Sequence, residues 1–152
     1  WSKTYAMTGW RMGYGVWPKT LIEGATRLAI NCHSCVNAAS QFAGIAALEG
    51  PQSDVDDMVQ AFDRRRGIIV EALNQIPGIT CAGSGGAFYA FANTSGTGIG
   101  SMALQDKFLN EAGVATLSGT SFGHMGEGYL RFSYANSVDN IKTAIQRIRE
   151  CL

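Results

Sequence analysis

The chain has 152 residues, of which 46% are hydrophobic, and its 12 basic side chains balance its 12 acidic ones. A formal net charge of zero gives no field that favours nucleic acid or an anionic membrane surface. No apolar run approaches the ~20 residues of a membrane-spanning helix, so we expect a soluble, cytoplasmic protein with one compact core.

The first third of the sequence predicts one strand and two helices. Arg11–Trp17 mixes aromatic, β-branched and glycine residues before Pro18, which is typical of a strand closed by a proline. Apolar residues then recur with a 3.6-residue period over Lys19–Ile30, which predicts a helix with one buried face. The alanine-rich segment Val36–Leu48 predicts a second, largely buried helix that ends at Gly50-Pro51.

The remainder predicts a long helix followed by alternating strands and helices. The long helix runs from an N-cap at Ser53-Asp54 to about Gln75. The expected elements after it are an adjacent pair of strands at Ile79–Cys81 and Ala87–Ala92, a helix at Ser101–Gly113, a strand at Val114–Leu117, a glycine-rich loop at Gly119–Gly128, a strand at Tyr129–Tyr134 and a helix at Ser137–Cys151. The closing helix has an apolar face at Ile141, Ala144, Ile145 and Ile148. The whole pattern indicates a mixed α/β chain.

Lys3 and Arg11 form the first candidate site. A neutral lysine amine can condense with an aldehyde and can also move a proton, and an arginine can hold a phosphate through two parallel donors. Taken singly, a surface lysine and a structural ion pair are the ordinary interpretations. The pattern that joins these two residues, S-K-x-x-x-M-T-G-W-R-x-G, reverses that preference.

Arg131 is the second candidate, because it lies within the otherwise apolar strand Tyr129–Tyr134. A charge in such a strand has to be paired or has to lie at the edge of a site. A structural salt bridge is the alternative interpretation.

Three other patterns receive no function. Cys32-His33-Ser34-Cys35 has the spacing of a redox or zinc motif, but nothing completes a ligand set, so we expect buried or half-buried reduced thiols and no metal. Arg64-Arg65-Arg66 is interpreted as a solvated helix face. Gly96-Thr97-Gly98-Ile99-Gly100 lacks the spacing of a dinucleotide-binding loop and is interpreted as a flexible turn.

Several segments together resemble the class I and II aminotransferases, fold-type I enzymes that depend on pyridoxal 5'-phosphate (PLP), and especially their aspartate aminotransferase-like members. They are the segment from Ser2 to Gly13, Asn37–Ala43, Gly50–Gln52, the helix with Arg64–Arg66, Pro77–Ile79, Gly85–Tyr89 and Gly126–Ala135. The resemblance implies an α/β fold that comprises the end of the large cofactor domain, residues 1–50, and the small domain, residues 51–152. The chain is therefore expected to be the C-terminal part of a longer enzyme.

The resemblance also implies roles for individual residues. Lys3 would attach PLP covalently and act as general base, Arg11 would bind the PLP phosphate, and Arg131 would bind the substrate α-carboxylate. Phe88 would lie near the substrate, with core packing as an even alternative. The expected activity is transamination between an α-amino acid and a 2-oxo acid by a homodimer in amino acid metabolism.

Two further implications concern what precedes Lys3 in the family. The aspartate that pairs with the PLP ring nitrogen and the glycine-rich phosphate turn belong to that part, so we expect this chain alone to be a poor catalyst. A PLP-dependent carbon–sulfur lyase of the same fold and a non-catalytic domain of a regulator are the alternatives. The family often has Pro-Gly where this chain has Ser118-Gly119, which leaves the shape of that loop open.

Overall fold

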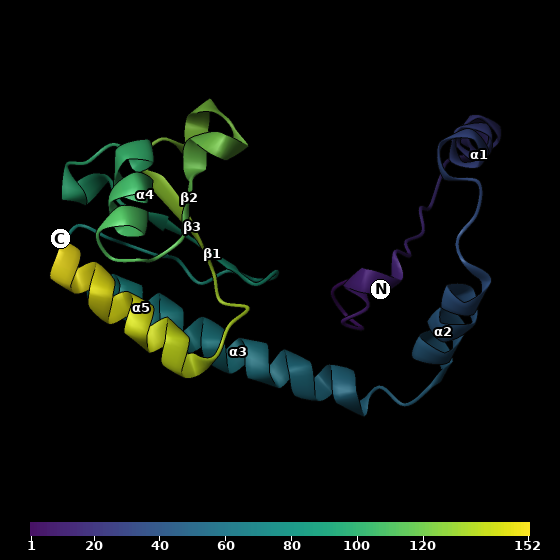
Figure 1. Ribbon diagram of the computed structural model, residues 1–152, viewed down its shortest axis with the longest axis horizontal. Coiled ribbons are helices and arrows are strands. Elements are labelled where there is room, and N and C mark those ends of the chain that lie inside the picture. Colours follow the sequence, from purple (N-terminus) through teal and green to yellow (C-terminus); the bar gives the residue numbers. More distant parts are fainter. The chain divides into compact units, whose positions relative to one another are not determined.

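The computed structural model describes all residues, 1–152, and they form two compact units, residues 1–57 and 58–152. Figure 1 shows the chain coloured along its sequence. Its long helix α3, Ser53–Asn74, begins in the first unit, and the residues from Met58 onward belong to the second. No helix of the chain combines the length and the apolar character needed to cross a membrane.

The first unit contains helices and turns but no strand. A short 3-10 helix η1, Thr8–Trp10, is followed by α1, Lys19–His33, and α2, Ala38–Glu49. Both α-helices were predicted, and Gly50 ends the second as expected. The predicted strand at Arg11–Trp17 is wrong, because this segment has no partner strand within the unit to complete a hydrogen-bonded ladder.

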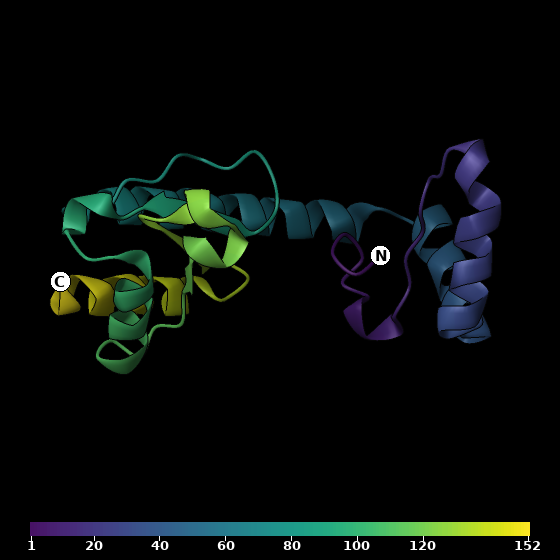
Figure 2. The same cartoon turned by 90° about the horizontal axis from the view of Figure 1, so that it is seen from above.

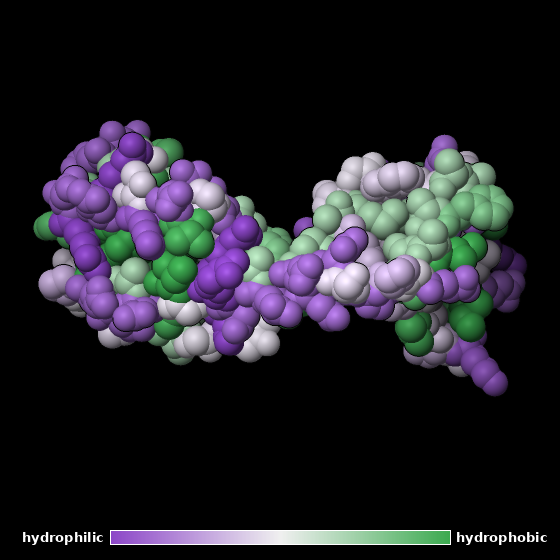
Figure 3. All heavy atoms as spheres, turned by 90° about the horizontal axis from the view of Figure 1, so that it is seen from below, coloured by the Kyte–Doolittle hydropathy of each residue, from purple (hydrophilic) through white to green (hydrophobic).

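The helices of the first unit bury few side chains. No residue of α1 is buried, and only Ser40 and Gly44 are buried in α2. The predicted buried face of α1 and the largely buried α2 are therefore both wrong for this unit. The exposed large apolar residues are Trp10, Tyr14, Val16, Trp17, Leu21, Ile22, Leu28, Ile30, Phe42, Ile45 and Leu48. Figure 3 shows broad pale-green and green areas over α1 and α2, at its right.

The second unit is a three-stranded antiparallel sheet with helices. Its strands are arranged in the order β1-β3-β2, and both outer strands pair with the last strand of the chain. The elements are α3, β1 (Tyr89–Asn93), η2 (Ser95–Thr97), α4 (Ser101–Asn110), β2 (Leu117–Ser118), η3 (Gly119–Phe122), η4 (His124–Gly126), β3 (Tyr129–Ser133) and α5 (Val138–Cys151).

The two faces of the sheet differ because successive side chains on a strand point to opposite sides. In β3, Leu130 and Phe132 are buried, whereas Tyr129 and Arg131 are only half-buried. In β1, Ala90 and Ala92 are likewise buried. The register pairs Arg131 with Phe91 and Leu117 across the sheet, so these three residues share its outer face.

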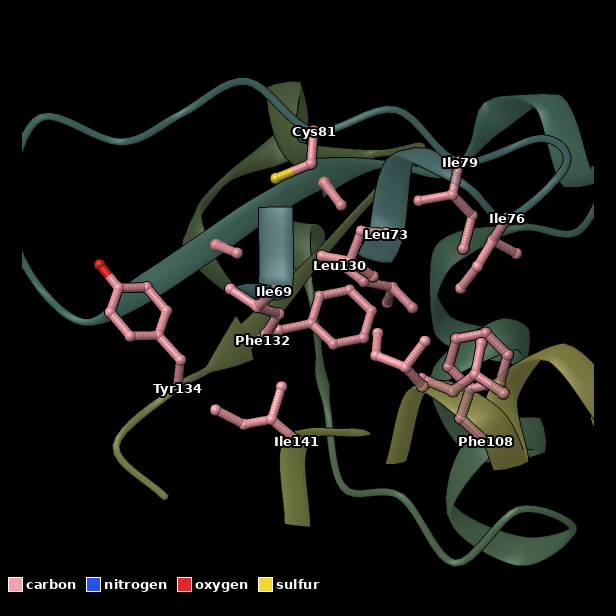
Figure 4. Packing of buried hydrophobic residues seen from close by; sticks show 14 of the residues in the cluster. Ile69, Leu73, Ile76, Ile79, Cys81, Phe108, Leu130, Phe132, Tyr134 and Ile141 are labelled. Carbon is pink, nitrogen blue, oxygen red and sulfur yellow. The ribbon is translucent and has the colours of Figure 1, made fainter. Parts of the chain in front are cut away.

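The core lies between the inner face of the sheet and the three helices α3, α4 and α5. Figure 4 shows side chains from these elements meeting in one cluster. Leu73, Leu104, Phe108, Leu130 and Ile148 each have no exposed surface. The predicted apolar face of α5 is confirmed, since Ile141, Ile145 and Ile148 are its buried residues.

Helices α3 and α5 run side by side (Figures 1 and 2). The guanidinium of Arg149 on α5 donates to the carbonyl of Ala72 on α3, at 3.4 Å, and to Oε1 of Gln75, just after the end of α3, at 2.8 Å. Arg66, in the predicted solvated run, pairs with Asp63 on its own helix and donates to the carbonyl of Ser84.

Three predictions for the second unit need correction. Ile79–Cys81 contributes only one bridge, Thr80 to Asn93, because β1 pairs along its length with β3 instead. The strand predicted at Val114–Leu117 is shifted to Leu117–Ser118, where β3 offers partners. The glycine-rich loop contains two 3-10 helices, whose i to i+3 bonds leave no simple periodic signal.

The four cysteines are all free, but they differ in exposure. Cys81 is buried in the core and Cys151 is half-buried, whereas Cys32 and Cys35 are exposed. The prediction of buried or half-buried thiols is thus wrong for the C-x-x-C pair, since helix α1 and the segment after it have little to pack against within their unit. Burial raises the pKa of the Cys81 thiol above its ordinary value.

Leu104 and Leu109 of α4 provide a matched test of the core. Leu104 has no exposed surface and Leu109 is 51% exposed, although both occupy the same helix. We expect Leu104→Ala to lower the free energy of unfolding by about 2–5 kcal/mol and Leu109→Ala by less than about 1 kcal/mol. Urea denaturation followed by circular dichroism measures both. Equal losses would contradict the described core.

Thiol reactivity tests the assignment of exposed and buried cysteines. The native chain should react with a thiolate-directed reagent such as iodoacetamide rapidly at Cys32 and Cys35 and slowly at Cys81, because Cys81 is covered and its thiolate is disfavoured. Peptide mapping after short exposure gives the order. Similar rates at the three sites in the folded chain, as in urea, would contradict the placement of Cys81.

Candidate functional site

The four predicted site residues lie in two units of the structure. Lys3 and Arg11 belong to the first unit, and Phe88 and Arg131 belong to the second. Each pair has its own local geometry.

Lys3 lies in a turn at the start of the first unit and its side chain is exposed. The backbone N–H of Ala6 donates to the Lys3 carbonyl at 3.2 Å, and Ala6 has a φ of 52°. The hydroxyl of Thr8 donates to the carbonyl of Ser2, the residue before the lysine, at 2.8 Å, which ties the two ends of this segment together. Trp1 anchors this turn to α2 through a hydrogen bond from Nε1 to the carbonyl of Gly44, at 3.1 Å.

Arg11 follows the Thr-Gly-Trp turn η1 and has left-handed backbone angles, with φ 53° and ψ 51°. Its Nη1 donates to the carbonyl of Thr8 at 3.1 Å, and no carboxylate pairs with it. The structural ion pair considered for Arg11 is therefore absent. The exposed guanidinium keeps further N–H donors for an anion.

An open hollow of about 1030 Å³ lies beside Arg11 within the first unit. Two glycines, Gly9 and Gly13, line it, and a Cβ at either position would meet nothing within 4 Å. The rest of the lining comes from the turn before Arg11 and from the end of α1 through the start of α2, with Ala6, Trp10, His33, Cys35, Val36, Asn37 and Ser40. A cation and small residues around an open space suit a phosphate group.

Arg131 lies on the outer face of the sheet, between two aromatic rings. Its Cζ is 4.2 Å from the centroid of the Tyr89 ring and 4.6 Å from the centroid of the Phe122 ring (Figure 1 shows β1, β3 and the loop after β2). No carboxylate and no hydrogen-bond acceptor contacts its side chain in this chain. Arg131 forms no salt bridge within this chain. The half-buried guanidinium keeps all its donors available.

Phe88 lies at the edge of the core just before β1. Its ring centroid is 6.0 Å from that of Phe62 and 4.5 Å from that of Tyr89, and its carbonyl accepts from the N–H of Tyr134 at 2.9 Å. Core packing thus describes the contacts of Phe88 within the second unit. Its place in a substrate pocket stays a prediction.

Phe122 was not predicted as a site residue. It ends η3, and its ring meets Phe91 edge-on at 6.2 Å between centroids, while Phe91 stacks on Tyr129 at 5.2 Å. The only signal in the sequence was an aromatic residue inside a glycine-rich segment. Nothing in that pattern indicates which strand the ring covers.

Gly119 and Gly126 close the loop that carries Phe122. A Cβ on Gly119 would lie 2.1 Å from the carbonyl oxygen of Gly126, and a Cβ on Gly126 would lie 2.0 Å from that of Gly119. The preceding Ser118 caps η3, because its Oγ accepts from the N–H of Thr120. The departure from Pro-Gly at Ser118-Gly119 thus supplies a cap in place of a rigid ring.

Glu127 secures the other end of the same loop to α4. Its Oε1 accepts from the N–H of Ser101 at 2.9 Å and its Oε2 accepts from the Ser101 hydroxyl at 2.8 Å. The buried Ser118 hydroxyl donates to Ser101 Oγ, which joins loop, strand and helix in one network. The backbone N–H of Ser101, then its hydroxyl, lower the pKa of Glu127 below its ordinary value.

The chain contains no candidate metal-binding site. No group of three or more His, Cys, Asp or Glu side chains is placed to hold an ion. His33 and Cys35 line the hollow beside Arg11, yet they lack the further ligands that a zinc site requires.

Comparison with known proteins relates both units to one family. Residues 1–148 match the family model described as "Aminotransferase class I and II". The chain belongs to this family. The prediction from the sequence is thereby confirmed for the family and for its mixed α/β, fold-type I class.

Relatives within this family match nearly all of the chain. It is 42% identical to an aspartate aminotransferase of Pyrococcus horikoshii over 99% of its length, and 43% identical to one of Geobacillus stearothermophilus over 97%. These matches cover 39% and 38% of the two relatives. The chain therefore spans about two fifths of the length of the curated aminotransferases that it matches.

Solved aminotransferase structures have the same fold over this part. The aspartate aminotransferase from Rhizobium meliloti gives a TM-score of 0.91 at 36% identity, covering 99% of this chain and 40% of that one. The aromatic aminotransferase from Pyrococcus horikoshii gives 0.93 at 35% identity, covering 97% and 40%.

The lowered pKa of Glu127 predicts how the stability of the second unit depends on pH. A carboxylate whose folded pKa lies below its unfolded value stabilises the fold above the unfolded pKa, and this stabilisation is lost as the pH falls through the folded one. We expect the free energy of unfolding to decline as the pH falls below 4.5, the ordinary pKa of Glu127. Glu127→Gln should remove that part of the decline.

Urea denaturation between about pH 3 and pH 6 measures this difference. Glu71→Gln is the matched control, because Glu71 lies on α3 with no hydrogen bond or ion pair from its side chain. The control should keep the wild-type decline. An unchanged decline in Glu127→Gln would contradict the assignment.

Proposed function

We propose that this chain is part of a PLP-dependent aminotransferase that exchanges an amino group between an α-amino acid and a 2-oxo acid. The observation that carries the proposal is Arg131, a half-buried guanidinium whose donors no group of the chain uses. A buried or half-buried charge without a partner costs free energy unless a ligand supplies one. The names of the aspartate aminotransferases among the relatives support the same activity.

The residues of the first unit fit the PLP phosphate. Arg11 lines an open hollow together with Gly9 and Gly13, so both charge and space are available for an anion. Arg11 would bind the phosphate through charge-assisted hydrogen bonds. PLP, when bound, supplies the electron sink that stabilises negative charge at the substrate Cα.

Lys3 would hold the cofactor covalently through its ε-amine and later act as a general base. Its neutral amine would take the proton from the substrate Cα and return it at the cofactor's aldehyde carbon. Lys3 is an exposed residue of this segment, and the hydrogen bonds of Trp1 and Thr8 hold the turn around it.

Arg131 would bind the α-carboxylate shared by the amino acid and oxo acid substrates. A planar guanidinium matches a carboxylate through two parallel hydrogen bonds, which fixes the orientation of the Cα substituents. Phe88, beside Tyr89 at the start of β1, would form part of the pocket wall.

We also propose a division into domains and an assembly for this chain. Residues 1–50 would be the end of the large PLP-binding domain, and residues 51–152 the small α/β domain. A homodimer that acts in cytoplasmic amino acid metabolism would match the expectation from the family. The carbon–sulfur lyase and the regulator domain remain second candidates, and no contact in the structure favours either.

Labelling with PLP tests the role of Lys3. The chain is titrated with PLP while the absorbance is recorded. It is then reduced with borohydride, and peptide mapping identifies the labelled lysines. We expect preferential labelling at Lys3 over Lys19, Lys107 and Lys142, and about tenfold weaker PLP binding in Arg11→Ala, because a charge-assisted hydrogen bond is lost.

Arg27→Ala is the matched control for Arg11→Ala. Arg27 belongs to the same unit, but its guanidinium pairs with Glu23 on α1. The control should bind PLP as the wild type does. Equal labelling of all four lysines, unaffected by Arg11→Ala, would contradict the proposed cofactor site.

A further inference from the structure

Two aromatic rings lie close to the guanidinium of Arg131. Its Cζ lies 4.2 Å from the Tyr89 ring centroid and 4.6 Å from the Phe122 ring centroid, and neither an ion pair nor a hydrogen bond from the chain fixes its rotation. A long side chain on a sheet surface otherwise samples many rotamers. The two rings are thus what restricts this one.

The two rings leave the N–H donors of the Arg131 guanidinium unused. Cations over aromatic faces are attracted by the negative face of the ring. With ring faces occupying positions close to Arg131, its N–H donors, which lie in the guanidinium plane, remain for a ligand. A planar carboxylate that arrives edge-on can then form both parallel hydrogen bonds.

The two rings are themselves supported by different elements. Tyr89 belongs to β1 and packs on Phe88 at 4.5 Å between centroids. Phe122 is presented by η3, in the loop that Gly119 and Gly126 close, and its ring meets Phe91. The position of the guanidinium is therefore tied to both the sheet and the loop after β2.

We infer that Tyr89 and Phe122 are positioning residues that hold Arg131 ready for a substrate carboxylate, an inference that rests on the proposed function. Fixing the guanidinium before binding reduces the conformational entropy that binding has to overcome. Phe122 is the sharper case, because it is 54% exposed and contributes no buried surface to the core.

The test follows the Nε–Hε resonance of Arg131 in ¹H–¹⁵N spectra of the 152-residue chain while acetate is added. Arg131→Lys identifies the resonance by removing it. In the wild type, we expect this proton to be shifted upfield by the neighbouring rings, and to move as acetate binds. Phe122→Leu, which keeps an apolar side chain, should lose much of the upfield shift and bind acetate about two- to fivefold more weakly.

Two further variants separate positioning from general packing. Phe122→Tyr keeps an aromatic face and should restore both the chemical shift and the affinity. Tyr129→Leu removes a ring from the same face of the sheet that stacks on Phe91 and not on Arg131, and it should leave both unchanged. Tyr89→Leu repeats the test from β1, and circular dichroism checks that each variant is folded.

The outcomes distinguish this inference from the proposed function. Acetate binding that is equally tight in wild type, Phe122→Leu and Tyr89→Leu would overturn the positioning role while leaving Arg131 as the carboxylate ligand. A changed chemical shift with unchanged affinity would overturn it too. If acetate leaves the wild-type Arg131 resonance unmoved, the carboxylate role of Arg131 fails, and positioning fails with it.

Discussion

The alternation of side chains along β3 is the constraint on which the second unit depends. Leu130 and Phe132 are buried in the core, and the same pleat obliges Arg131 to face the other way. A shift of one residue in the pairing would exchange the two sets and bury a guanidinium among apolar side chains. The hydrophobic core and the half-buried cation on the outer face of the sheet are therefore fixed by one register.

The loop between β2 and β3 places Phe122 beside Arg131 on this outer face. Its ends are held by the close approach of Gly119 and Gly126 and by the carboxylate of Glu127 on the start of α4. The loop that carries Phe122 therefore has a close backbone contact between Gly119 and Gly126 and a hydrogen bond from the Ser101 N–H to Glu127. The polar network of Ser101 and Ser118 satisfies buried hydroxyls at the same place.

Periodicity predicted the elements of the second unit well. The helices near Ser53–Gln75 and Ser137–Cys151 and the strands near residues 87–92 and 129–134 appear within a few residues of their predicted bounds, because each has a strong apolar period. The failures have a common origin. A sequence pattern identifies a face that can be buried, but it does not supply the partner that buries it, as at Arg11–Trp17 and along α1.

The candidate site was only partly predictable. Arg131 was found because a charge in an apolar strand requires an explanation, and Lys3 and Arg11 were found through a family resemblance. The sequence did not indicate that Phe122 and Tyr89 are neighbours of Arg131. Their contact with it depends on sheet register and on 3-10 geometry between β2 and β3. Such contacts join residues far apart in the sequence.

The central claim is that Arg131 binds a substrate carboxylate in a PLP-dependent aminotransferase. The most direct measurement is kcat/KM for amino-group transfer from an α-amino acid to a 2-oxo acid in a longer protein that carries this chain, with Arg131→Lys compared against the wild type. The account predicts a loss of at least about tenfold, because lysine cannot form two parallel hydrogen bonds. An unchanged kcat/KM in folded, PLP-loaded Arg131→Lys would contradict it.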